Sequence, residues 1–482
     1  MLLYAWRLWS SVSGESLGQP NMSESQPEPA TSTTKQPSCC APPNRAFQQL
    51  QEEGGQAAAD ARPSLPGFSA ARKLLFFCTY LMYICVNTVN GPLMPAMKVS
   101  LNFTSHDGAT IAAVQTVGIS AGKLVYGGWP VDACGARRTY AATMLVIGTL
   151  ACTYSVQRVA PGVAAVAFLV EFFSTPAYPC HVQLIRGWMP ADEVGAGFWL
   201  LGMSSRVGDM LSKLSYGTLL SVLAWQQLTL LAAGLGGFAA LVGGVFHSDT
   251  PTARNAPGVR ASPGELRAVL RRMLCSGRFW LAASAASATT CMKRTLEMLV
   301  ALFFFDCSSV VSQGAAAQLA MTWSGGLATS VLVAGWLFNR MPPRGKLALM
   351  GALMSTTVLC CAALSSLARV EATSWRDVAA RAALVFIAAL GVGMPYYVPT
   401  GIFSVQFGGS NSGVVSAYLD TVSFAVSGAF IAALGPIFDG SAGWSTVWGI
   451  MAVTGVVMML LQLAFLRMLL KAPSATGEGA KA

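Results

Sequence analysis

The stretch GKLVYGGWPVDACGARR, residues 122–138, joins two apolar runs of membrane length by a tight turn. Glycine and proline allow the chain to turn, while a carboxylate can cap and pair with neighbouring helix ends and guanidiniums stay in water. The positions expected to act in this turn are Gly128, Asp132, Gly135, Arg137 and Arg138. The sequence here therefore predicts a membrane hairpin with a charged connection.

A weaker copy of this turn, GWLFNRMPPRGK, occupies residues 335–346 and also lies between two apolar runs. It places Asn339 where the first copy has Asp132, followed by Arg340 and then by Arg344, Gly345 and Lys346. Because the two copies are separated by about half the chain, they indicate a duplicated membrane protein.

The composition agrees with a membrane protein. Of 482 residues, 54% are hydrophobic and only 11% are charged, and the mean hydropathy is +0.53, which is too apolar for an ordinary soluble domain. The net charge of +10 comes from lysines and arginines in short loops rather than in one patch, so no nucleic-acid partner is expected. Most of the twelve cysteines lie in apolar runs without a disulfide spacing.

Apolar runs of about 20 residues, enough to cross a core of about 30 Å, follow one another from residue 72. Because spanning backbone must satisfy its own hydrogen bonds, these runs predict helices and an all-α membrane fold. The twelve expected spans are 74–96, 109–130, 139–157, 162–183, 195–217, 223–246, 279–304, 312–338, 347–368, 382–406, 413–437 and 445–466.

These spans divide the chain into two six-helix halves with polar segments around them. The expected parts are a disordered cytosolic tail (1–71), a first bundle (72–246), a cytosolic central loop (247–278), a second bundle (279–466) and a second cytosolic tail (467–482). Most loop lysines and arginines lie on one face, which the positive-inside rule places in the cytosol with both termini. The sequon at Asn102 lies on the opposite face, where glycosylation is possible.

Twelve helices in two matching sixes, with the turn at residues 128–138, resemble the major facilitator superfamily. The resemblance implies alternating access around a midplane site, with the turn's charges latching the two bundles. Asn339 stands where the second copy of the motif prefers aspartate.

Within this superfamily, GISAGK (residues 118–123) resembles the second helix of the organophosphate/phosphate antiporters, including its lysine, Lys123. The resemblance implies a phosphate-binding base in helix seven, where Lys293 or Arg294 stands. The chain also departs from that group: Asn87 stands where helix one carries an arginine, and Ser205 where helix five carries a histidine. Arg206 follows directly and supplies another base.

Nine charged residues lie inside the expected spans, where charge is costly and therefore usually binds or pairs. Five are basic (Lys123, Arg206, Lys213, Lys293, Arg294) and four are acidic (Glu171, Asp209, Glu297, Asp420). Helical spacing predicts the local pairs Arg206–Asp209, Asp209–Lys213 and Arg294–Glu297. The excess of positive charge favours an anionic substrate, bound by Arg206, Arg294 and Lys123, or the charges are purely structural.

The acidic residues leave a second interpretation open, in which Glu171, Glu297 or Asp420 carries a proton for a symporter or antiporter of a sugar, carboxylate or other solute. Tyr83 and Tyr397 are candidates for substrate contact, and GVGMP (residues 391–395) with Pro399 predicts a broken or bent tenth helix.

An enzyme has little support in the sequence, and no catalytic residue, metal site or cofactor is expected. The three histidines, His106, His181 and His247, are far apart in sequence, and no P-loop occurs. A non-transporting receptor on the same fold is a further alternative. The sequence thus predicts a secondary active transporter of an organic anion, with phosphorylated metabolites first, acting in the bilayer as a monomer.

Overall fold

The computed structural model describes residues 70–126, 129–189, 194–248, 270–408, 412–438, 440 and 443–471. The described chain is almost wholly helical, and its only β-type contact is an isolated bridge between Ser308 and Ala372. The predicted tails over residues 1–69 and 472–482, and the central loop over residues 249–269, lie outside these ranges.

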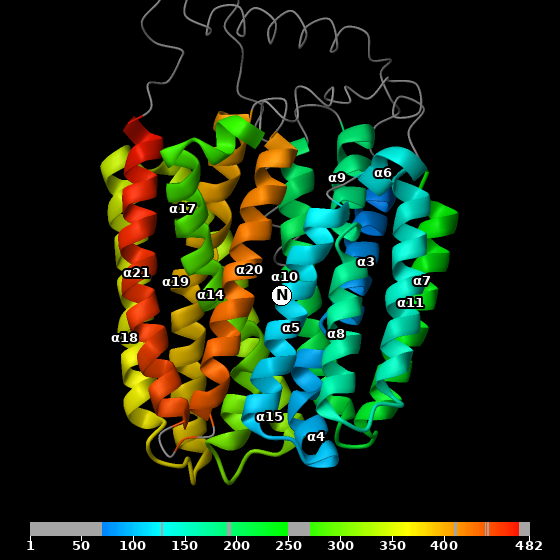
Figure 1. The fold of residues 1–482 in the computed structure, drawn as a ribbon, viewed down its shortest axis with the longest axis vertical. Helices are drawn as coiled ribbons and strands as arrows, with labels where there is room; N and C mark the ends of the chain where they lie inside the picture. The colour runs from blue at the N-terminus through cyan, green and yellow to red at the C-terminus, as the bar shows by residue number, and fades with distance from the viewer. Residues whose placement is uncertain are drawn as a thin grey trace, which may run out of the picture. The chain divides into compact units, whose positions relative to one another are not determined.

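The first half of the fold is built from nine helical segments (Figure 1). They are α3 (Ala70–Asn87), α4 (Asn90–Leu101), α5 (Ser105–Tyr126), α6 (Trp129–Cys134), α7 (Ala136–Tyr154), α8 (Ala160–Ser174), α9 (Ala177–Trp188), α10 (Val194–Leu219) and α11 (Trp225–Phe246).

The second half follows the central loop and contains the longest helices. Its segments are α14 (Gly277–Asp306), α15 (Gln313–Leu319), α16 (Met321–Thr329), the π-helical turn η1 (Ser330–Ala334), α17 (Gly335–Arg340), α18 (Pro343–Leu367), α19 (Trp375–Gly408), α20 (Ser412–Phe438) and α21 (Gly443–Lys471).

These segments form twelve transmembrane helices, six in each half, as the sequence predicts. Three of the twelve are built in pieces: the first from α3 and α4, the fourth from α8 and α9, and the eighth from α15 to α17. Eight stretches of the described chain are long and apolar enough to cross a membrane, and two of them combine α3 with α4 and α8 with α9. Neither α10 nor α14 is among them, and each carries three charged residues in its middle.

The tenth helix is not broken, because α19 continues through GVGMP and Pro399, and a bend at this place stays a prediction. Neighbouring helices bond backbone groups at this place. Met394 N donates to Ser330 Oγ at 2.9 Å, and Gln462 Nε2 donates to Pro395 O at 3.3 Å. Pro399 has no N–H to offer that carbonyl, so Gln462 supplies the missing donor.

The turn that joins the second and third spans is confirmed as a tight one at its glycine. Gly135 has φ 84° and precedes α7 directly, a conformation that a residue with a Cβ adopts only at a cost. Arg137 Nε donates to Gly244 O of α11 at 2.5 Å, so this arginine ties the turn to its own half.

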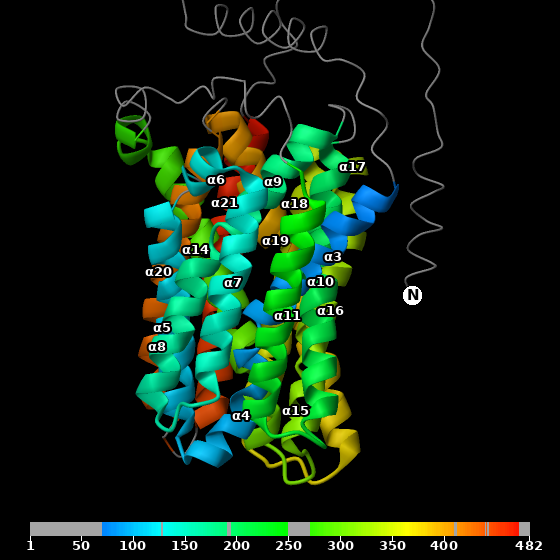
Figure 2. The same cartoon turned by 90° about the vertical axis from the view of Figure 1, so that its right-hand side faces the viewer.

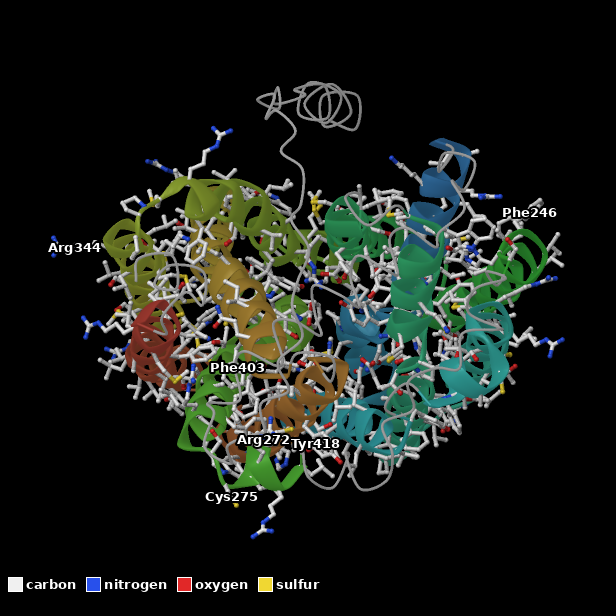
Figure 3. All side chains as sticks on the ribbon, turned by 90° about the horizontal axis from the view of Figure 1, so that it is seen from above. Phe246, Arg272, Cys275, Arg344, Phe403 and Tyr418 are labelled. Carbon is white, nitrogen blue, oxygen red and sulfur yellow. The ribbon has the colours of Figure 1, made fainter. Side chains whose placement is uncertain are left out.

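The two halves meet along α5 and α20 and at the end of the bundle that holds α4 and α15, called here the α4 end (Figures 1 and 2). At this end the backbones of α10 and α15 lie so close at Gly217 and Gly314 that a Cβ added to Gly314 would be 2.5 Å from Gly217 O. Viewed from the other end, the α6 end, Arg344 of the second half and Phe246 of the first lie on opposite sides (Figure 3).

Candidate functional site

The candidate site is centred on α14, whose residues 289–304 are all buried. Lys293, Arg294 and Glu297 occupy one stretch of this helix, and the spacings of three and four residues place both bases beside the carboxylate. A helix that carries three buried charges in a membrane protein needs partners on neighbouring helices, and two helices of the first half provide them.

Glu171 on α8 is the first of these partners. Its Oε1 accepts from Arg294 Nη2 at 2.6 Å and from Gln115 Nε2 at 3.0 Å. Its Oε2 accepts from Asn87 Nδ2 at 3.1 Å and from Ser174 Oγ at 3.3 Å. All four acceptor positions of the carboxylate are therefore in use, and Glu171 connects helices one, two, four and seven.

Glu297 is the corresponding acid of the second half. It accepts from Lys293 Nζ at 2.8 Å, from Arg294 Nη1 at 3.1 Å and from Arg206 Nη1 at 3.3 Å. Arg206 lies on α10 of the first half, so each half contributes an arginine to a glutamate of the other. These two reciprocal ion pairs join the halves near the middle of α10 and α14.

The resulting group, called here the central cluster, consists of Glu171, Arg206, Lys293, Arg294 and Glu297. Three bases face two carboxylates, which leaves a formal charge of +1 among side chains that are 8% exposed or less. The Nε atoms of Arg206 and Arg294 have no hydrogen-bond partner among the described residues. Because buried donors are normally satisfied, these two atoms indicate a ligand or bound water.

Aromatic rings surround the central cluster. The Arg206 guanidinium lies 5.9 Å from the ring centre of Tyr397, and Lys293 Nζ lies 4.9 Å from that of Tyr396, both within the range of a cation–π contact. Tyr83 is buried and lies 5.3 Å from Tyr80 between ring centres. Tyr397 thus lies beside Arg206, and the role of Tyr83 and Tyr397 in contacting a substrate stays a prediction.

A neutral pair adjoins the cluster on α10. Lys213 Nζ donates to Asp209 Oδ2 at 3.1 Å, as the helical spacing predicts, and Ser324 of α16 bonds both residues. The predicted Arg206–Asp209 pair is wrong, because Arg206 turns to Glu297 of the other half instead. The predicted Arg294–Glu297 pair is confirmed.

Lys123 and Asp420 form an ion pair with each other across the halves, from α5 to α20. Their side chains are 26% and 39% exposed, and no hydrogen bond or ion pair in the described chain connects them to the central cluster. Phe424 lies under the ammonium at 5.3 Å. Lys123 therefore pairs with Asp420 of the other half, whereas Arg206 and Arg294 pair with the two glutamates.

Of the gating residues predicted from the sequence motif, Arg137, Arg138 and Arg340 are exposed at the α6 end. The side chains of Asp132 and Asn339, and all of Gly128, lie outside the described part of the chain. The latch role of this turn stays a prediction.

A second inter-half cluster lies at the α4 end and was missed from the sequence. Lys98 Nζ donates to Asp306 Oδ1 and to Ser105 Oγ, both at 2.6 Å. The other carboxylate oxygen of Asp306 accepts from Ser105 Oγ at 2.6 Å and from Trp444 Nε1 at 3.1 Å. We call Lys98, Ser105, Asp306 and Trp444 the α4-end cluster. A hollow of about 960 Å³ opens beside it and contains no residue of the central cluster.

Arg381 directly precedes the expected span 382–406, but the structure starts this helix earlier, at Trp375. Arg381 lies in α19, is buried, and donates to Cys307 O at 2.6 Å, to Leu367 O at 2.9 Å and to Val370 O at 2.5 Å. Cationic side chains favour the carbonyl-bearing C-terminal ends of helices, and Arg381 holds two such ends, those of α14 and α18.

Two histidines that are distant in sequence also come together. His181 Nε2 lies 3.1 Å and His247 Nε2 lies 3.2 Å from Thr79 Oγ1, and the rings are 5.9 Å apart. No group of three or more His, Cys, Asp or Glu side chains suited to a metal ion occurs among the described residues.

Sequence reasoning also missed Gln115 and Asn90, which extend the central cluster. Asn90 Nδ2 donates to Gln115 Oε1 at 3.0 Å, and Gln115 in turn donates to Glu171. A search for amides as well as charges within apolar runs would have found both, because a buried amide also needs partners.

Comparison with known proteins agrees with this arrangement. A family model described as Major Facilitator Superfamily matches residues 76–432, and no curated protein matches the chain significantly. A crystal structure of a peptide transporter, POT, in complex with sulfate is similar with a TM-score of 0.65 and 15% identity, over 86% of this chain and 98% of that one.

Two further transporters have the same fold. The nucleoside transporter NupG gives a TM-score of 0.63 at 14% identity, over 82% of this chain and 98% of that chain. The D-xylose-proton symporter gives 0.64 at 11% identity, over 81% and 96%. At such low identity, these similarities concern the fold.

Proposed function

Because this chain belongs to the Major Facilitator Superfamily, and is thus a membrane transporter and not an enzyme, we propose that it moves a small organic anion by alternating access. The leading substrate class is a phosphorylated metabolite, exchanged for phosphate. The observation that carries this proposal is the formal charge of +1 in the central cluster, together with the unpartnered Nε atoms of Arg206 and Arg294.

Two properties of the arginines support an anion. A guanidinium matches the oxygens of a carboxylate or phosphate with parallel hydrogen bonds, and it stays charged when buried. Both arginines also hold inter-half ion pairs. An anion that enters the cluster competes with Glu171 and Glu297 for these donors, and so its binding loosens the contact between halves that must move apart.

This competition gives a route to obligatory exchange. Without an anion, the reciprocal ion pairs hold the halves together at the cluster, whereas a bound anion takes over part of the arginines' charge. The protein then changes its open side more readily when loaded, because a ligand shifts a conformational equilibrium by its differential affinity for the two states.

The orientation and the remaining roles belong to the same proposal. Both termini face the cytosol, so the α4 end faces the opposite compartment, and the protein acts as a monomer. Asp132 with Arg137 and Arg138 controls opening at the α6 end, where Lys123 and Asp420 also join the halves.

Counterflow in proteoliposomes tests the proposal. Vesicles loaded with phosphate receive labelled glycerol phosphate or hexose phosphate outside, with and without a pH gradient. Uptake that requires internal phosphate and ignores the gradient is the expected result. Empty vesicles that take up the label equally well would contradict exchange.

A proton-coupled transporter is the second candidate, since Glu171, Glu297 and Asp420 each form an ion pair that spans the halves. Substrate binding to an arginine releases a carboxylate, which can then take up a proton. Uptake of a neutral or carboxylate solute driven by a proton gradient would favour this mechanism. Specific binding without any flux would favour the remaining alternative, a receptor on the same fold.

A further inference from the structure

The amide side chains of the first transmembrane helix place hydrogen-bond acceptors beside the central cluster. Asn87 Nδ2 donates to Glu171 Oε2 at 3.1 Å. A carboxylate only accepts hydrogen bonds, so it fixes which end of the amide faces it. The carbonyl end, Asn87 Oδ1, must therefore face elsewhere, and it has no partner in the described part of the chain.

The same logic applies one step further along the network. Gln115 gives its N–H to Glu171 and so presents its carbonyl to Asn90, whose own N–H is used there. This leaves Asn90 Oδ1 buried and again without a partner among the described residues. The Glu171 carboxylate thus orients Asn87 directly, and orients Gln115 and through it Asn90. The carbonyl oxygens of Asn87 and Asn90, both in the first transmembrane helix, are left without a partner among the described residues.

These acceptors belong to the same bonded network as the unpartnered donors. Asn87 reaches Glu171, Glu171 reaches Arg294, and Arg294 shares Glu297 with Arg206. Asn87 and both arginines are more than nine-tenths buried. A ligand that satisfies the cluster needs anionic oxygens for the guanidiniums and a hydrogen-bond donor for the amide carbonyl.

We propose that the central site recognises a hydroxylated anion, and that Asn87 Oδ1 accepts a hydrogen bond from the substrate hydroxyl next to the anionic group. This inference rests on the proposed anion transport and narrows its substrate class. A substrate ammonium is also a hydrogen-bond donor, but the formal charge of +1 on the cluster disfavours the binding of a further positive charge. Simple alkyl anions offer no hydroxyl and leave the carbonyl unsatisfied, so the site binds them less tightly.

Matched ligands separate the hydroxyl from the anion. We would titrate the purified full-length protein calorimetrically with glycerol phosphate and propyl phosphate, and with glycerate and butyrate. Ethanolamine phosphate tests the ammonium. A site that hydrogen-bonds a hydroxyl rejects the analogue without it, so the hydroxylated member of a pair should bind at least about tenfold more tightly.

The variant Asn87→Leu should bring this ratio below about threefold, since it removes the acceptor. Thr116→Val is the matched control: it removes a buried hydroxyl on α5 that bonds only Ala112 O of its own helix, and should leave the ratio unchanged. If Asn87→Leu does not fold, the wild-type ratio alone still decides.

Equal binding of the paired ligands to the wild-type protein would overturn the hydroxyl inference while anion binding stands. A folded Asn87→Leu variant with the full ratio would overturn the role of Asn87, and tighter binding of ethanolamine phosphate than of glycerol phosphate would replace the hydroxyl by an ammonium. If no anion of either pair binds, the proposed function fails first, and this inference fails with it.

Discussion

The central cluster and the α4-end cluster both join the two halves through buried or partly buried charges, but they differ in how completely their polar atoms are satisfied. At the α4 end, one lysine faces one aspartate, and a hydroxyl and an indole N–H complete the bonding. In the central cluster, three bases face two acids, and among the described residues neither its two guanidinium Nε atoms nor the carbonyls of the attached Asn87 and Asn90 have a partner. The balanced cluster closes an interface, whereas the unbalanced one leaves polar atoms that a ligand or bound water can satisfy.

The largest effect should follow from Arg294→Ala, which removes one of the three bases of the central cluster and so its excess of positive charge. The change removes a partner from Glu171 and from Glu297 together, and breaking a buried ion pair costs about 3–5 kcal/mol. Counterflow should fall by more than about a hundredfold. Arg294→Lys is the control for charge: it keeps the cation but loses the fork that reaches both acids. Unchanged transport by Arg294→Ala would remove Arg294 from the site.

Arg381→Met tests a cation whose described partners are all backbone carbonyls. Hydrogen bonds to charged groups contribute about 1.5–3 kcal/mol, so the loss of three should destabilise the protein by at least about 2 kcal/mol, measured as the free energy of unfolding in detergent. The ratio of affinities for glycerol phosphate and propyl phosphate should stay as in the wild type. A changed ratio would show that Arg381 acts on the central site after all.

Asp306→Asn should unlatch the α4 end, and neighbouring Cys307 reports it. Burial and, after it, the negative charge of Asp306 raise the pKa of the Cys307 thiol to about 12, so at pH 8 little of it is the reactive thiolate. Opening restores a pKa nearer the usual 8.5 or so and accelerates alkylation, measured on the Cys307 peptide by mass spectrometry. The partly exposed pair contributes about 1 kcal/mol, which predicts about fivefold faster labelling.

The pH dependence of this labelling has a definite sign. In the wild type the rate should still be rising with pH above 9, because the raised pKa keeps the thiol protonated there. In Asp306→Asn it should level off at lower pH, because the neighbouring negative charge is gone and because the thiol is no longer buried once the α4 end opens. Identical profiles for the two proteins would mean that Asp306 does not hold the α4 end closed.

The smallest effect is expected for Lys123 and Asp420. Their side chains are 26% and 39% exposed, and exposed ion pairs contribute about 0.2–1 kcal/mol. A double-mutant cycle of Lys123→Ala and Asp420→Ala on the transport rate should give a coupling within that range. A coupling as large as that between Arg294 and Glu171 would place Lys123 in the central site, as the sequence first suggested.

The sequence by itself determined the spans and two of the three predicted local pairs. Hydropathy runs gave twelve helices because a bilayer imposes their length, and spacings of three and four residues gave Arg294–Glu297 and Lys213–Asp209 because one helix carries both partners. The excess of base over acid inside the spans is likewise a property of the sequence, and it already favoured an anion.

Only the tertiary structure decided which residues meet across helices. Arg206 and Glu297 are 91 residues apart, Glu171 and Arg294 are 123 apart, and Lys123 and Asp420 are 297 apart. Such contacts depend on the rotation and packing of whole helices, which no local pattern records. The same holds for the orientation of Asn87, which the distant carboxylate of Glu171 fixes, and for Lys98 with Asp306, which meet because the halves close at the α4 end.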